Sequence, residues 1–179
     1  LILNLSCKSQ SSTPELKANF SADQIADLKK ITDFFESQIC ENDKANFKDC
    51  FTPILPNLID FGYEQIFERA DFQKQKELYQ SIGKNSFNEI WNFCLSTNLK
   101  TNEKYQSLCA KGIDGKYAEF LLTVGGKNKF VKEYAERLIA SGDFERSTLL
   151  QQWIYTHKDS FDLENQNIVI GELSLLNSD

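Results

Sequence analysis

The stretch Ser21–Cys40, with the sequence SADQIADLKKITDFFESQIC, decides how the rest of the chain is interpreted. Ser21 and Gln24 stand at the spacing of a capping box, in which a hydroxyl and an amide satisfy donors of a helix's first turn. Apolar side chains then recur every three or four residues and form one stripe: Ile25, Leu28, Ile31, Phe34, Phe35 and Ile39. This periodicity predicts a helix over residues 22–40 whose stripe faces a core.

Helical spacing continues along most of the chain. A second capping box, Ser86-Phe87-Asn88-Glu89, predicts the start of a helix that carries Ile90 to Leu95. Asn128 can cap a helix at 129–141, and Gly142 supplies its left-handed stop. We expect the other helices at residues 44–51, 63–69, 72–82, 103–111, 117–124 and 147–157. Residues 163–176 fit either a strand or a helix, and we favour the helix.

Short helices with short connections predict an all-α fold, either a compact orthogonal helical bundle or a small α-solenoid. The aromatic residues between positions 63 and 93 have spacings that suit its core, and a groove for a lipid or peptide is the alternative. These residues are Tyr63, Phe67, Phe72, Tyr79, Phe87, Trp91 and Phe93.

Four cysteines lie within this helical region: Cys40, Cys50, Cys94 and Cys109. Three pairings are possible, and sequential pairing predicts two local disulfides that staple neighbouring helices. Disulfides suit an exported protein in an oxidising compartment. A zinc site is the rival interpretation, but the spacings are not CxxC and His157 is the only histidine.

The charge of the chain is uneven. Its net charge of −6 argues against general binding to nucleic acids. Residues 99–132 hold seven lysines against three acidic residues, a net charge of +4 that leaves −10 for the rest. Within this stretch, Lys127, Lys129 and Lys132 are candidate binding residues for an acidic partner, anionic lipid or glycan. The alternative is a set of solvated helix faces, and we expect reversal of these three charges to leave folding nearly intact.

The first residues, LILNLSCKSQSS, end an apolar run on Leu5-Ser6 and continue with Cys7 and a polar tract. This pattern resembles the end of a bacterial lipoprotein signal peptide, although Asn4 replaces the usual aliphatic residue. The resemblance implies lipidation at Cys7 and a location in the bacterial cell envelope, anchored to a membrane and facing the periplasm or exterior. It divides the chain into a signal-peptide remnant (1–6), an anchor cysteine with a flexible tether (7–20) and a single helical domain (21–179). Without it, the same residues form a frayed end or buried strand and a linker.

No catalytic or cofactor-binding fingerprint is found in the sequence. His157 and the carboxylate pairs Asp60–Glu64 and Glu133–Glu136 are better explained as exposed groups on helices. The sequence therefore predicts a non-enzymatic module that binds a protein partner without metal or cofactor, and an immunity-type inhibitor of a secreted toxin is one form of it. The alternatives are a surface binder of host or environmental ligands, a small envelope hydrolase using unidentified carboxylates, and a structural subunit of an envelope complex.

Overall fold

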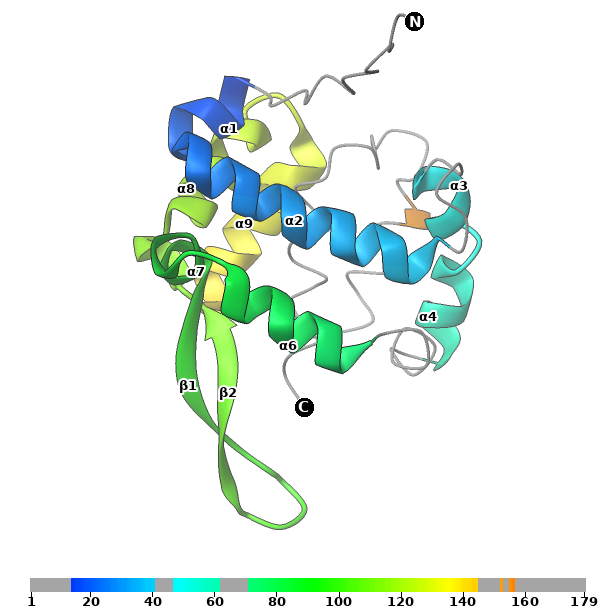
Figure 1. Cartoon of the computed structure of the whole chain (residues 1–179). Helices are drawn as coiled ribbons and strands as arrows, with labels where there is room; N and C mark the ends of the chain where they lie inside the picture. Colours follow the sequence, from blue (N-terminus) through cyan, green and yellow to red (C-terminus); the bar gives the residue numbers. More distant parts are fainter. Residues whose placement is uncertain (1–13, 41–46, 62–70, 145–151, 153–154, 157–179) are drawn as a thin grey trace, which may run out of the picture.

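The computed structural model describes residues 14–40, 47–61, 71–144, 152 and 155–156 of the chain (Figure 1). The elements follow in the order α1 (Pro14–Asn19), α2 (Ala22–Ile39), α3 (Phe47–Phe51), α4 (Leu55–Phe61), α6 (Phe72–Ser81), α7 (Lys84–Ile90), β1 (Trp91–Thr97), β2 (Lys104–Ala110), η1 (Gly112–Asp114), α8 (Lys116–Gly125) and α9 (Lys129–Ser141). Helix α2 crosses the middle of the molecule with α6 beside it, and the β1–β2 hairpin projects away from the helices (Figure 1).

The central helix α2 forms as its sequence predicts. The Gln24 N–H donates to Ser21 Oγ over 3.3 Å, and the Ser21 N–H donates to Gln24 Oε1 over 3.0 Å, so the capping box is confirmed. The expected stripe faces the core, with Ile25 and Phe34 half-buried at its margins. Its buried members are Leu28, Ile31, Phe35 and Ile39. Burying large apolar side chains of this kind stabilises the fold by about 1.5–3 kcal/mol each.

The core continues at both ends of α2. At the C-terminal end, the Phe35 ring lies 5.9 Å from that of Phe47 and 6.0 Å from that of Phe51, beside the disulfide between Cys40 and Cys50. At the other end, α8 and α9 pack against each other. They bury Phe120, Leu121, Tyr134, Ala135 and Leu138.

The turn between α8 and α9 is tight. The Asn128 side chain accepts hydrogen bonds from the N–H groups of Phe130 and Val131, as its predicted capping role requires. A Cβ atom at Gly125 would lie 2.7 Å from the Cα of Lys132, so only glycine permits this approach of the two helices. Gly142 ends α9 with a φ of 71°, which confirms the predicted left-handed stop.

Residues 14–20, expected within a flexible tether, include a helix that packs on the domain. Helix α1 contacts α8, and the buried Phe20 ring lies 5.7 Å from the Phe120 ring. Lys127 also forms an ion pair of 2.7 Å with Glu15. Residues 14–20 therefore belong to the folded part of the chain that the structure describes.

The expectation of an all-α bundle or α-solenoid is wrong. β1 and β2 form a two-stranded antiparallel sheet, so the fold is mixed α and β. These strands replace the helices expected through Ile90–Leu95 and at 103–111. The reason is the period of two in Trp91–Thr97, where the apolar Trp, Phe and Leu alternate with other residues. The predicted disulfides, Cys40–Cys50 and Cys94–Cys109, are both present.

The prediction of a second capping box at Ser86–Glu89 is also wrong. Helix α7 begins at Lys84 with Gly83 as its N-cap, and Ser86 lies inside the helix. The Ser86 hydroxyl donates to Asp27 on α2 instead of capping its own helix. The expected helix at 63–69, most of that at 147–157 and the whole of 163–176 lie outside the described residues.

Candidate functional site

The feature that stands out from the helical body is the β1–β2 hairpin. Its strands pair from Trp91↔Ala110 at the root to Thr97↔Lys104 near the tip. Side chains of an antiparallel pair alternate between the two faces, and directly opposed residues share a face. Phe93, Leu95 and Thr97 therefore lie on the same face as Lys104.

An aromatic cluster fixes the root of the hairpin to the helices. Trp91 is buried, and its ring lies 5.3 Å from Tyr79 on α6 and 5.5 Å from Phe87 on α7. Phe87 also lies 5.6 Å from Phe93, the next residue on the same face of β1. Aromatic pairs at these distances add to the burial of their apolar area. The direction of the hairpin is thus set by rings buried at its base.

Beyond this root, the hairpin exposes most of its apolar side chains. Five large apolar side chains of the described residues are exposed, and four of them lie on the hairpin: Phe93 (60%), Leu95 (77%), Leu99 (92%) and Tyr105 (39%). The fifth, Leu122 (45%), lies on α8. The expectation that Phe93 belongs to the core is therefore wrong. Scattered exposed leucines need no explanation, but a cluster on one projecting element is typical of an interaction site.

The tip of the hairpin is ordered by short polar contacts. Asn98 Oδ1 accepts from the backbone N–H groups of Lys100 at 2.9 Å and Thr101 at 3.3 Å, which forms a turn typical of asparagine. Asn102 then takes a positive φ of 59°, a conformation that asparagine tolerates better than most residues. Leu99, the most exposed of the apolar residues, lies within this turn.

A disulfide holds the two strands on the opposite face. Cys94 and Cys109 lie diagonally across the ladder, with 6.0 Å between their Cα atoms, and both are half-buried. A two-stranded hairpin alone is marginally stable in water. The bridge therefore supplies stability that the exposed side chains cannot, because they make few contacts with the protein.

The hairpin also differs in charge from the rest of the chain. Residues 91–111 carry Lys100, Lys104 and Lys111 against Glu103, a net charge of +2 that leaves −8 elsewhere. Glu103 accepts a hydrogen bond from the Thr101 hydroxyl within the turn. None of the three lysines forms an ion pair with another described residue. Their charges are thus available to an acidic partner.

The three lysines predicted as binding residues lie elsewhere, in the turn after α8 and on α9. Each is close to a carboxylate: Lys127 to Glu15, Lys129 to Glu133 over 3.6 Å, and Lys132 to Glu136 over 3.8 Å. These pairs offset the positive charge locally. Reversal of Lys127 would place a second carboxylate beside the mostly buried Glu15 and oppose the docking of α1.

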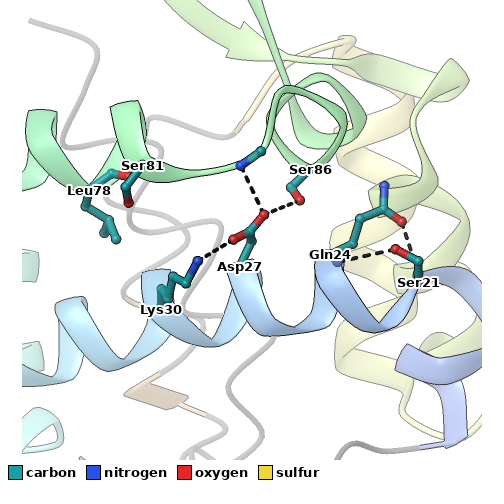
Figure 2. Close-up of polar contacts among 8 residues, drawn as sticks. Ser21, Gln24, Asp27, Lys30, Leu78, Ser81 and Ser86 are labelled. Atoms are coloured by element: carbon teal, nitrogen blue, oxygen red, sulfur yellow. Dashed lines mark hydrogen bonds and ion pairs between the residues drawn. The ribbon is translucent and has the colours of Figure 1, made fainter.

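A second polar cluster joins α2 to the start of α7 and to Gly83 just before it (Figure 2). The Asp27 carboxylate accepts hydrogen bonds from Ser86 Oγ at 2.6 Å, Lys30 Nζ at 2.7 Å and the Gly83 N–H at 3.1 Å. Burial raises the pKa of Asp27, but the hydrogen bonds from Lys30, Ser86 and Gly83 together outweigh it and hold this pKa below its ordinary value. The carboxylate is thus kept ionised as an acceptor that fastens two helices.

Asp27 and Ser86 do not resemble a catalytic pair. A nucleophilic serine needs a base that can take its proton at neutral pH, and a lowered pKa makes Asp27 a weak base. Among the described residues, no cluster of His, Cys, Asp or Glu could hold a metal ion. Cys7, Glu64 and His157, named as candidates from the sequence, lie outside the described residues.

Comparisons with known proteins do not assign the chain to a family. No family model matches it, and no curated protein or solved structure matches it significantly. Within the described part of the chain, no helix has both the length and the apolar character needed to span a membrane.

Proposed function

We propose that this chain is a non-enzymatic protein-binding module whose contact surface is the β1–β2 hairpin. The observation that carries the proposal is the concentration of exposed apolar side chains on that hairpin, which holds four of the five exposed large apolar side chains of the described residues. Interfaces are typically centred on apolar and aromatic anchors within a polar rim. Phe93, Leu95 and Leu99 would be the anchors, and Lys100 and Lys104 part of the rim.

The immunity-type inhibitor expected from the sequence would use the acidic charge of the whole chain to attract a basic toxin. The hairpin instead offers a localised surface of opposite charge. We therefore propose the broader class, a binder of a protein partner, without assigning that partner to toxins.

We further propose that the module works outside the cytoplasm, attached to a membrane through lipid on Cys7. The two disulfides support an oxidising, exported setting. Cells producing the precursor should incorporate a radiolabelled fatty acid into the wild-type chain and not into Cys7→Ala, which should move to the soluble fraction. A wild-type chain that stays unlabelled and soluble would refute the anchor and leave the proposed binding surface unaffected.

Photo-cross-linking in the native cells tests the binding surface. A photoreactive residue at position 95 should form an adduct with one specific protein, because Leu95 lies on the exposed face of β1. The matched control places the same residue at position 122, since Leu122 is an exposed leucine on α8. Identical adducts at both positions, or none at position 95, would contradict the proposal.

A further inference from the structure

The hairpin has two outer backbone edges, one on each strand, and the hydrogen bonds at its ends show which backbone groups face outward. The Lys111 N–H donates to Ile90 O over 2.8 Å, and the Asn98 N–H donates to Glu103 O over 2.9 Å. Bonded and non-bonded pairs alternate along an antiparallel ladder. In the observed register, residues 92, 94 and 96 therefore bond to β2. The N–H and C=O groups of Phe93, Leu95 and Thr97 point away from it.

The two edges differ in how they are protected. The outward N–H of Ala110 on β2 donates to Asp143 Oδ1 over 2.8 Å, which confirms the direction of the ladder and closes the root of that edge. No described residue bonds to the outward N–H groups of Phe93, Leu95 or Thr97. Among the residues that the structure describes, nothing therefore pairs with the edge of β1 from above its buried root to the tip.

The sequence of β1 does nothing to discourage pairing at this edge. Proteins commonly protect open edges with charged residues, proline or bulges. The β1 sequence WNFCLST contains no charge and no proline, whereas β2 begins with Lys104. Phe93 and Leu95, whose outward N–H groups no described residue bonds, also have exposed apolar side chains. One added strand could thus use both the backbone and the side chains of β1.

The positions of the hairpin lysines indicate which residues an added strand would carry. Phe93 and Leu95 occupy the root half of the apolar face, while Lys100 and Lys104 lie at the tip. A segment with alternating apolar residues followed by carboxylates would match this order. Carboxylates would also be repelled by the rest of the chain, with its net charge of −8, and so would be directed to the hairpin.

We propose that an extended acidic segment of the partner protein adds to the edge of β1 as a third strand between Phe93 and Thr97. The inference rests on the proposed function and names the mode of binding. Strand addition of this kind takes affinity from backbone hydrogen bonds and specificity from alternate side chains.

Amide hydrogen exchange of the full-length protein, resolved by residue, tests the proposal. The probe is a synthetic peptide that alternates valine with threonine and ends in two glutamates. Its binding should slow exchange at the Phe93, Leu95 and Thr97 amides by about tenfold or more, since these donors become bonded. The Gln106 amide, which faces outward on β2, should not change. A peptide with lysines in place of the glutamates should bind about tenfold more weakly.

Two variants separate backbone pairing from side-chain contact. Leu95→Pro removes an outward N–H that the hairpin does not use, so it should abolish peptide binding while the Cys94 and Ser96 amides stay protected. Leu95→Ala keeps the N–H and should bind more weakly than the wild type but still protect Phe93. Binding by Leu95→Pro as tight as by the wild type would overturn strand addition.

The remaining outcomes are equally decisive. Protection at the Gln106 amide would show that the peptide adds to the edge of β2. Binding without protection of any outward amide would show that the peptide contacts only the apolar side chains. Concentration-dependent protection of β1 without peptide would identify a second copy of this chain as the occupant. Each of these results, or no peptide binding, would overturn the proposal. The proposed function would still stand if position 95 forms its specific adduct in cells.

Discussion

Replacing Asp27 with alanine should lower the free energy of unfolding by about 2–3 kcal/mol, because a buried ionised acceptor is removed from three donors. The Gly83 N–H and Ser86 hydroxyl would be left without this acceptor at the contact between α2 and the start of α7. The matched control is Asp33→Ala, which removes an exposed carboxylate paired with Lys29 on the same helix. Exposed pairs contribute only about 0–1 kcal/mol. Urea titration of both variants would contradict this account if their losses were equal.

The same carboxylate should make stability depend on pH in the acid range. Its folded pKa lies below the ordinary value of 3.8, so its contribution is complete above that value and is lost as pH falls through the folded pKa. The stability difference between the wild type and Asp27→Asn should therefore be constant near neutrality and shrink below about pH 4. A stability difference that instead grew on acidification would mean that folding raises the pKa of Asp27, and it would contradict this account.

Removing the Cys40–Cys50 disulfide with alanines should lower the free energy of unfolding by about 3 kcal/mol, from loop closure alone. The melting temperature should fall by roughly 6–12 °C for a chain of this size. Cys40 is buried in the core that also holds Phe35, Phe47 and Phe51. Loss of its packing there adds to the effect of the lost disulfide.

The matched comparison removes Cys94–Cys109, whose loop is of similar length. Because the hairpin projects from the body, it can loosen while the helical core stays folded. We therefore expect faster amide exchange along β1 and β2 and a smaller change in global melting temperature. Scanning calorimetry with residue-resolved exchange would check both. A larger global loss from Cys94–Cys109 than from Cys40–Cys50 would contradict this division of roles.

Local signals in the sequence predicted the helices that depend on local contacts. The Ser21–Gln24 capping box, the Asn128 cap and the Gly142 stop are all formed within a few residues of chain. The Ser86–Glu89 motif has the same spacing but fails, because Asp27 takes the Ser86 hydroxyl from 59 residues away. Such long-range competition leaves no local pattern in the sequence.

The hairpin was missed for a different reason, although its signal was present. The alternation from Trp91 to Thr97 and the asparagines at positions 98 and 102 are typical of strands joined by a turn. The buried Trp91 and the preceding helix masked that period. The disulfide pairing was nevertheless predicted correctly, because a hairpin and a pair of helices both bring nearby cysteines together. That Phe93 and Leu95 are exposed depends on where the hairpin projects, which composition does not reveal.

The most direct test of the hairpin as the binding surface is an affinity comparison. The protein captured from position 95 would be purified, and its dissociation constant measured for the wild type, Leu95→Ser and Leu122→Ser. Losing the burial of one leucine should weaken binding by Leu95→Ser by about tenfold to a hundredfold, while Leu122→Ser should bind like the wild type. If Leu95→Ser stays folded and binds as tightly as the wild type, the hairpin is not the contact.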